Sequence, residues 1–199
     1  ESCFIHCSSL TSISIPNSVI SIGKSCFKKC ISLTSISIPN SVISIGQSCF
    51  IGCSMLEKVF IGNGLQYINK SIFVSCNKLN LIEISADNPY FCKYEGILYD
   101  KNKTKIIIVP SNISHLTISE TINTISSYSF SGCQQLTSIS IPNSVTSIGD
   151  CCFSSCSSLK SISIPNSVTS IGESCFSECY SFTSISIPNN VTSIGESCF

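Results

Sequence analysis

Cysteine is the residue type that could support the most chemistry in this chain, which has 15 cysteines among 199 residues. Ten of them form five Cys-x3-Cys pairs, from Cys3 and Cys7 to Cys175 and Cys179, and a phenylalanine follows the first cysteine of each pair. This spacing is compatible with zinc, which takes similar pairs when two of them converge. Two other interpretations are disulfides between same-phase cysteines, such as Cys26 and Cys49, and buried free thiols. The apolar setting beside phenylalanine and the odd total favour free thiols, and we predict no metal site.

The other reactive residue types give no pattern for catalysis. His6 and His115 are the two histidines, so no histidine cluster can form, and the abundant serines recur as repeat surface instead of marking one nucleophile. The glycines are isolated in Ile-Gly turns, without a loop that could cradle phosphate. We therefore predict that the chain is not an enzyme and needs no cofactor.

Charge argues against nucleic acid as a partner, and the lack of a long aliphatic run argues against a membrane span. The chain has 11 lysines, no arginine and 11 acidic residues, so its formal net charge is zero. Without a positive field or an arginine fork, binding to nucleic acid is not expected. The longest aliphatic run, 106–109, is far shorter than the roughly 20 residues of a membrane-spanning helix. We predict no direct membrane insertion by this segment.

A 23-residue repeat positions these residues. Phe4, Phe27, Phe50 and Phe73 follow one another at that spacing, and it resumes from Phe130 through Phe153 and Phe176 to Phe199. Within the unit that starts at Leu33, the alternation at 36–38 predicts a strand, which the Pro39-Asn40 turn ends. A second short extended piece is predicted at 42–45, and a single helical turn at 49–53. One unit is too small to fold alone, so the units must stack into a curved solenoid.

The repeated unit resembles a known family. Its pattern L-x-S-I-x-I-P-x-S-V-x-x-I-G-x-x-C-F-x-x-C is similar to the leucine-rich repeat of BspA-like surface proteins, in which alanine is usual before the phenylalanine. The resemblance covers essentially the whole chain. It implies a β-dominated α/β leucine-rich repeat solenoid over 1–199, within a longer array, and it implies surface display or secretion and adhesion.

One repeat, residues 79–113, carries an insertion, because Leu79 and Ile113 are 34 positions apart where 23 are expected. Turn signals predict a short projecting hairpin, with 97–99 and 105–109 as its strands around a turn at 100–104. The same segment gathers aromatic and cationic side chains, which either pack and solubilise the hairpin or form a contact surface. Its candidate contact residues are Tyr90, Tyr94 and Tyr99.

The outward residues of the first strand should form two rows across the concave side of the solenoid. Most of them are serine, but the rows change character in the central repeats, where Phe60 stands in a serine position. An exposed phenylalanine could anchor a partner, although drift beside the insertion would give the same departure. The candidate binding residues of these rows are Lys58, Phe60, Leu81, Glu83, His115 and Thr117.

We predict a binding module that presents a serine-lined concave face to a protein or to a cell-surface or matrix ligand, with adhesion as its activity. The alternative is a structural spacer that self-associates through its ends. The chain begins and ends within a repeat, at the same Glu-Ser-Cys-Phe, so we expect it to be a fragment with uncapped ends.

Overall fold

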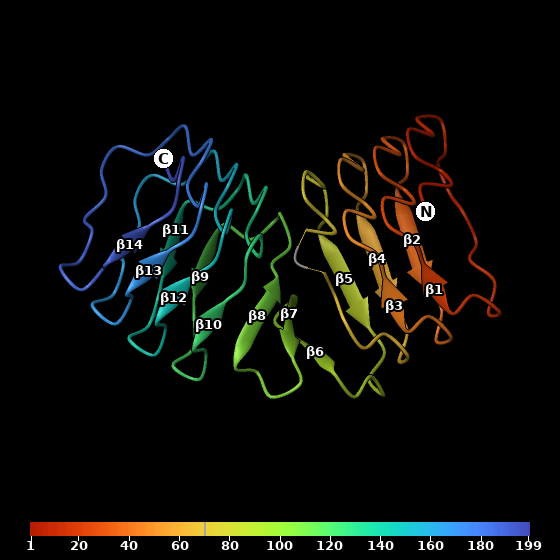
Figure 1. Cartoon of the computed structure of the whole chain (residues 1–199), viewed down its shortest axis with the longest axis horizontal. Coiled ribbons are helices and arrows are strands. Elements are labelled where there is room, and N and C mark those ends of the chain that lie inside the picture. Colours follow the sequence, from red (N-terminus) through yellow and green to blue (C-terminus); the bar gives the residue numbers. More distant parts are fainter. Residues whose placement is uncertain (70) are drawn as a thin grey trace. The chain divides into compact units, whose positions relative to one another are not determined.

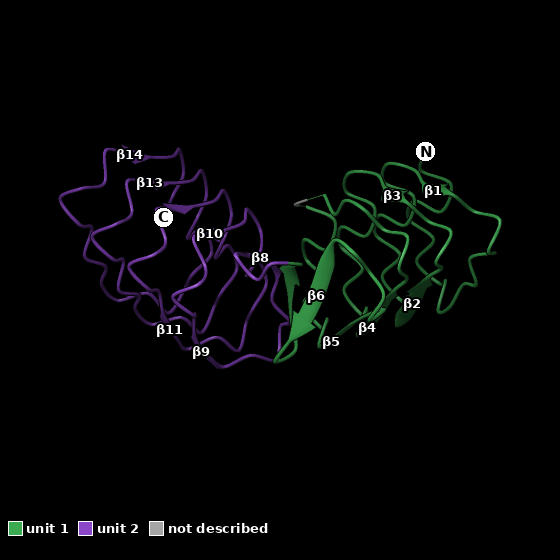
Figure 2. Ribbon diagram, turned by 90° about the horizontal axis from the view of Figure 1, so that it is seen from below, with its two compact units in different colours: residues 1–101 green, residues 102–199 purple. Residues whose placement is uncertain are grey.

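The computed structural model describes residues 1–69 and 71–199, and it contains two compact units, residues 1–101 and 102–199 (Figure 2). The regular elements of the described residues are all strands, joined by tight turns (Figure 1). This confirms the predicted β-dominated repeat fold. That the two units form one continuous solenoid stays a prediction.

Unit 1 stacks its coils through two parallel ladders. The first joins β2 (Ser35–Ile38), β4 (Lys58–Ile61) and β5 (Leu81–Ile84), each displaced by 23 residues from its neighbour. The second joins β1 (Ser21–Ile22) to β3 (Ser44–Ile45), and a bridge continues it from Ser44 to Tyr67. The period of two places isoleucine or valine inward and leaves alternate residues outward, as predicted.

Unit 2 repeats this arrangement. Its first ladder joins β9 (His115–Thr117) to β11 (Ser138–Ser140), and bridges extend it through Ser163 to Ser186. Its second ladder runs in the order β8, β10, β12, β13, β14. The bounds of these strands are β8 (Lys105–Ile108), β10 (Thr124–Ile125), β12 (Ser147–Ile148), β13 (Ser170–Ile171) and β14 (Ser193–Ile194).

The third side of each coil is not the helical turn that the sequence predicts. In the coil around Phe27, Ser25 and Lys29 have left-handed φ values of 54° and 59°, which interrupt a right-handed helix. The backbone N–H groups of Ser25 and Lys29 donate to carbonyls of the next coil. The N–H of Phe27 does the same, to the carbonyl oxygen of Cys49 over 2.9 Å. These bonds replace the i to i−4 bonds of a helix. The prediction was correct about which residues face inward but wrong about the backbone.

Aromatic rings form the spine of both cores. The rings of Phe4, Phe27, Phe50 and Phe73 are stacked in unit 1, with centroids 5.2, 5.4 and 5.5 Å apart. Phe130, Phe153, Phe176 and Phe199 are stacked in unit 2. The stacking keeps successive coils in register.

Glycine allows the closest approach between coils. A Cβ added to Gly172 would lie 2.4 Å from the backbone nitrogen of Asp150 in the preceding coil. The recurring Ile-Gly dipeptide therefore marks a point where a side chain cannot be accommodated without separating the backbones.

The insertion forms a hairpin and contains one strand that the sequence did not predict. The strands β6 (Phe91–Tyr94) and β7 (Ile97–Asp100) pair in antiparallel register around Glu95 and Gly96. The predicted strands 97–99 and 105–109 are both present, as β7 and as β8 of unit 2, and β8 comes next to β7 in the strand order of the sheet. On its other side, β8 pairs in parallel with β10. Because Phe91, Ile97 and Leu98 are buried, and the last two point to opposite faces of β7, the hairpin packs into the core instead of projecting.

Asn88 anchors this hairpin. Its side chain is fully buried, and its Nδ2 group donates to the carbonyls of Gly62 and Leu65 over 3.0 and 3.1 Å. Its Oδ1 atom accepts from the backbone N–H groups of Tyr90 and Phe91 over 2.8 and 2.9 Å. One amide therefore satisfies backbone groups on both the preceding coil and the hairpin.

Within the described residues, no helix is long and apolar enough to cross a membrane.

Candidate functional site

The first ladder of unit 1 presents two outward rows of side chains, which we call the front face of unit 1. Lys58 lies between Ser35 and Leu81 in one row. In the other, Phe60 lies between Ser37 and Glu83. The predicted rows of this unit are therefore present in the predicted register.

Phe60 is the most apolar exposed group of the front face. It lies on β4 with 41% of its surface exposed, whereas Val59 and Ile61 beside it are buried. Its exposure follows from strand alternation, since residues 59 and 61 must face the core. The strand therefore exposes a phenylalanine side chain to solvent at a position where the preceding coils have serine.

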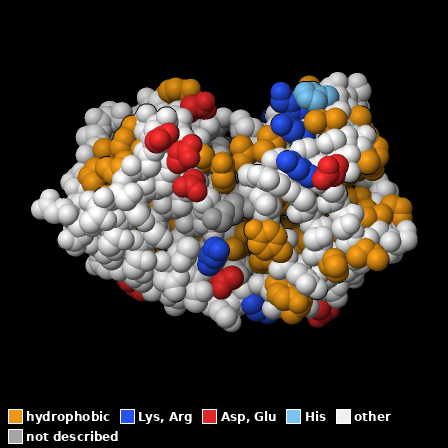
Figure 3. All heavy atoms as spheres, in the orientation of Figure 1, with side chains coloured by type: hydrophobic (Ala, Val, Ile, Leu, Met, Phe, Trp, Pro, Cys, Tyr) orange, Lys and Arg blue, Asp and Glu red, His pale blue; other side chains and the backbone are white. Residues whose placement is uncertain are grey.

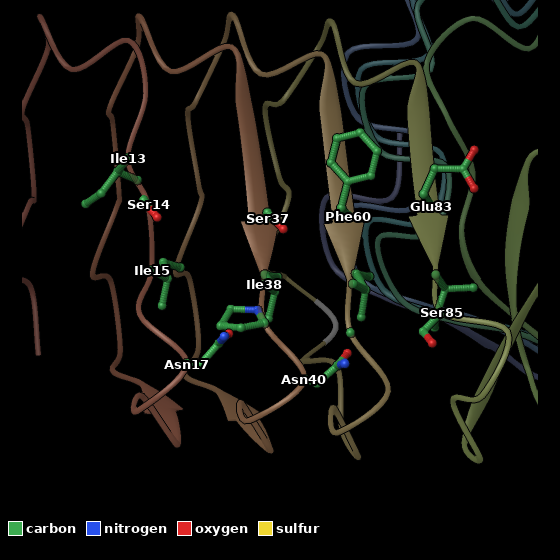
Figure 4. A pocket seen from close by; sticks show the side chains of 14 residues that line it. Ile13, Ser14, Ile15, Asn17, Ser37, Ile38, Asn40, Phe60, Glu83 and Ser85 are labelled. Atoms are coloured by element: carbon green, nitrogen blue, oxygen red, sulfur yellow. The ribbon is translucent and has the colours of Figure 1, made fainter.

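A groove of about 610 Å³ passes across this face beside Phe60. It crosses four successive coils, and its lining includes Ser14, Ser37, Phe60 and Glu83, one from each coil (Figure 4). Pockets of about 300–1,000 Å³ that combine apolar walls with a few polar groups are typical of ligand sites. We call this feature the Phe60 groove.

Two asparagines that sequence analysis treated only as turn residues also line the Phe60 groove. Asn17 and Asn40 follow the outward serine of their coils by three residues, and both lie at the same end of the groove in Figure 4. The Oδ1 atom of Asn40 accepts from the backbone N–H of Asn63 over 3.0 Å, which orients its amide. The available signal was the repeat itself, because the Pro-Asn turn ends the same strand in each of these coils.

Glu83 is connected to the hairpin by an ion pair. The Nζ atom of Lys93, on β6, lies 2.5 Å from Oε1 of Glu83, and both side chains are partly exposed. The nearby positive charge offsets the only carboxylate in the groove lining. The structure therefore brings part of the hairpin to the front face, which the sequence did not predict.

The three candidate tyrosines do not share one environment. Tyr90 and Tyr94 are exposed, whereas Tyr99 is half-buried. Burial raises the pKa of Tyr99, and the charge of Glu95 raises it further. None of the three lines the Phe60 groove, so the hairpin tyrosines stay a separate, untested candidate surface.

The remaining two candidates lie in unit 2. His115 and Thr117 are outward residues of β9, and they pair in register with Ser138 and Ser140. The Nδ1 atom of His115 lies 2.7 Å from the Ser138 hydroxyl and 3.2 Å from the Thr137 hydroxyl. The predicted set is therefore divided, with these two in unit 2 and the others in unit 1.

The cysteines are packing groups with a hydrogen-bonding role. All fifteen are free, eleven of them are buried, and the described residues contain no group of three or more potential metal ligands. The thiols of Cys30, Cys53 and Cys76 donate to phenylalanine carbonyls in the preceding coil over 3.0 to 3.1 Å. Burial is the main cause that raises the pKa of the Cys53 thiol to about 12. These contacts favour the buried-thiol interpretation of the pattern.

Comparison with known proteins establishes the family. The profile described as "BspA type Leucine rich repeat region" matches six copies over residues 1–113 and 108–199. The chain belongs to the BspA-type leucine-rich repeat family. Repeats of this family are in general non-enzymatic binding scaffolds. Comparison with curated proteins gives no significant match.

Solved structures share the BspA-type fold. A leucine-rich repeat protein from Eubacterium ventriosum has 24% identity and a TM-score of 0.66, with 87% of this chain and 63% of that one covered. The pneumococcal vaccine antigen PcpA has 20% identity and a TM-score of 0.62, with 89% and 57% covered. A leucine-rich cell surface protein from Faecalibacterium prausnitzii has 23% identity and a TM-score of 0.66, with 98% and 68% covered. The chain thus spans less than two thirds of the first two structures.

Proposed function

We propose that this chain is the binding module of a surface-displayed or secreted protein, and that its partner, a protein or a cell-surface or matrix ligand, docks in the Phe60 groove. Adhesion is the activity that this arrangement would support. The exposed ring of Phe60, in a row otherwise made of serine and a paired carboxylate, is the observation that carries the proposal.

The surface chemistry of the chain supports this location. White atoms, which are backbone and uncharged polar side chains, cover most of the face in Figure 3, and charged groups occur in small clusters. Serine hydroxyls exchange water for a partner with little net gain, whereas an aromatic ring removes a large apolar area from water. Phe60 can therefore supply a large share of the binding free energy, as the anchor residues of interfaces do.

The relatives support display outside the cell. One similar structure is named a cell surface protein and another a vaccine antigen, and the family profile covers this chain throughout. Surface or secreted location and binding of a matrix or cell-surface partner come to this chain by that likeness.

The test is adhesion of the 199-residue chain, immobilised on beads, to an epithelial monolayer and to a reconstituted basement-membrane matrix. Removing an anchor worth about 2 kcal/mol lowers affinity about thirtyfold, so Phe60→Ser should nearly abolish bead retention. Tyr180→Ser is the matched control, because Tyr180 is 79% exposed in unit 2 and lies outside the groove. Equal retention of the Phe60→Ser and wild-type beads would reject this site, and no retention of wild-type beads would reject adhesion to these surfaces.

Self-association through the terminal coils stays the alternative. In the isolated 199-residue chain, Phe4, Ile194 and Phe199 of those coils are 36, 48 and 61% exposed. Light scattering distinguishes the two functions. Oligomers that disappear when lysine replaces Ile194 and Phe199 would favour assembly, whereas a monomer that adheres through Phe60 would favour the binding module.

A further inference from the structure

The direction of the Phe60 groove restricts what can occupy it. The groove is lined by successive coils, so an extended occupant runs across the strands. Its subsites then repeat with the coil spacing, which is about 4.8 Å between paired strands. On the phenylalanine side of the same coils, the stacked rings are 5.2 to 5.5 Å apart.

This spacing suits a chain of sugar rings better than an extended peptide. An extended peptide advances about 3.3 Å per residue, so its side chains lose register with the coils after one or two steps. In an extended β-1,4-linked pyranose chain, one ring and its glycosidic oxygen advance by about the distance between two coils, whose paired strands are about 4.8 Å apart. Successive sugars can therefore meet equivalent serines on successive coils.

The apolar part of the groove suits the face of a sugar ring. The ring of Phe60 points outward from β4, between Ser37 and Glu83, and 41% of its surface is exposed (Figure 4). An aromatic face carries partial negative charge, and the axial C–H groups of a pyranose carry partial positive charge. Stacking would thus bury apolar surface while leaving the sugar hydroxyls directed sideways.

The polar part of the groove can bind those hydroxyls. Asn17 and Asn40 each supply an amide, and Ser14 and Ser37 supply hydroxyls that both donate and accept. The amide of Asn40 is already oriented by the Asn63 N–H, so its Nδ2 group is the donor directed at a ligand. A Cβ on Gly62 would lie 2.6 Å from Asn40 Oδ1, so the lack of a side chain at residue 62 leaves room for the Asn40 amide.

The charges of the lining favour a neutral ligand. No lysine lines the groove, and its one carboxylate, Glu83, is paired with Lys93. A sulfated or sialylated chain would find no cation in the groove, and a basic peptide would find only a carboxylate that is already paired.

We infer that the Phe60 groove binds a neutral, extended pyranose oligosaccharide, whose rings lie across successive coils and one of which stacks on Phe60. The inference rests on the proposed function, because it identifies the ligand class of the same groove.

The test is calorimetric titration of the 199-residue chain with four neutral hexasaccharides: β-1,4-glucose, β-1,3-glucose, β-1,4-N-acetylglucosamine and α-1,6-mannose. At least one should bind with a Kd below about 1 mM, and its affinity should be unchanged in about 1 M NaCl because no charge is involved. Phe60→Leu keeps an apolar side chain but loses the aromatic face, so it should weaken binding at least about tenfold, whereas Phe60→Trp should retain it. Asn40→Ala should weaken binding, and Asn143→Ala, at the same repeat position in unit 2, should not.

Cell binding separates failure of this inference from failure of the proposed function. Periodate cleaves the vicinal diols of 1,4-linked glucose and 1,6-linked mannose, so it should remove Phe60-dependent retention of the beads on the monolayer if either of these hexasaccharides binds. An excess of the hexasaccharide that binds should remove this retention in every case. If no hexasaccharide binds, and retention survives periodate but still requires Phe60, the saccharide inference is wrong and the binding function stands. If a hexasaccharide binds equally well to the Phe60→Leu variant, the assigned site is wrong.

Discussion

At the scale of single residues, the cysteine pattern that suggests metal binding is explained by burial of most of the thiols and by weak hydrogen bonds from several of them. Cys133 is 1% exposed, and burial alone raises the pKa of its thiol to about 12. Its Sγ atom lies 3.6 and 3.7 Å from the carbonyl oxygens of Val109 and Pro110. The reactive form of cysteine is the thiolate, so a buried thiol such as that of Cys133 is inert at neutral pH. Spacing alone could not separate this from a zinc pair, because it carries no information about burial.

The raised thiol pKa values predict loss of stability in alkali. In the unfolded chain these thiols ionise near pH 9.0, whereas Cys133 in the folded chain holds its proton until about pH 12. Its contribution is therefore fully present below pH 9 and is lost as the pH rises from 9 to 12, by about 1.4 kcal/mol per pH unit. The free energy of unfolding, measured in urea at pH 8, 9, 10 and 11, should therefore decrease as the pH rises above 9.

Cys133→Ala isolates this contribution. The variant should be less stable at pH 8, because it loses packed volume, but its stability should fall less steeply above pH 9. Cys3→Ala, which removes an exposed thiol, is the control. A slope that is identical in wild type and the Cys133→Ala variant would contradict the burial explanation.

At the scale of elements, periodicity predicted the strands, while local backbone conformation escaped it. The alternation in 35–38 and 58–61 gave β2 and β4 in the correct register, because a one-residue slip would expose the core row. The third side was mispredicted because serine seldom adopts the left-handed φ that Ser25 has. The strands at 97–99 and 105–109 were predicted correctly, but β6 was not, because Glu95-Gly96 was not recognised as a turn. That dipeptide takes φ values of 48° and 81°, as a two-residue hairpin turn requires.

Asn88 provides a test of how the hairpin is held. Asn88→Ala would leave two carbonyls and two backbone N–H groups without their buried partner, which should cost about 3 kcal/mol. The loss should appear as a lower free energy of unfolding in urea and as faster hydrogen exchange in β6 and β7. Asn143→Ala, at an exposed turn of unit 2, should change stability by no more than about 0.5 kcal/mol. Similar exchange rates of the β6 and β7 amides in both variants would show that Asn88 is not the anchor.

At the scale of the whole molecule, a uniform scaffold carries an uneven surface. Among the described residues, all but three of the exposed large apolar side chains lie in unit 1, the exceptions being Tyr180, Ile194 and Phe199. The sequence showed Phe60 as a departure from the serine row, and the register confirmed its place. It did not show the groove, because the groove depends on where the turns of neighbouring coils lie and on the direction of side chains such as Asn40. A repeat pattern fixes which residues face outward, but the space between them is set in three dimensions.

The most direct test of saccharide binding in the Phe60 groove is an NMR titration with the tightest-binding hexasaccharide. The chain is labelled with 13C in its phenylalanine rings and with 15N throughout. The account predicts that the ring signals of Phe60 and the side-chain amide signals of Asn17 and Asn40 shift together and saturate at one Kd. The rings of Phe50 and Phe153 should not move, because both are fully buried. Shifts confined to unit 2 or to the hairpin tyrosines, with Phe60 unchanged, would contradict it.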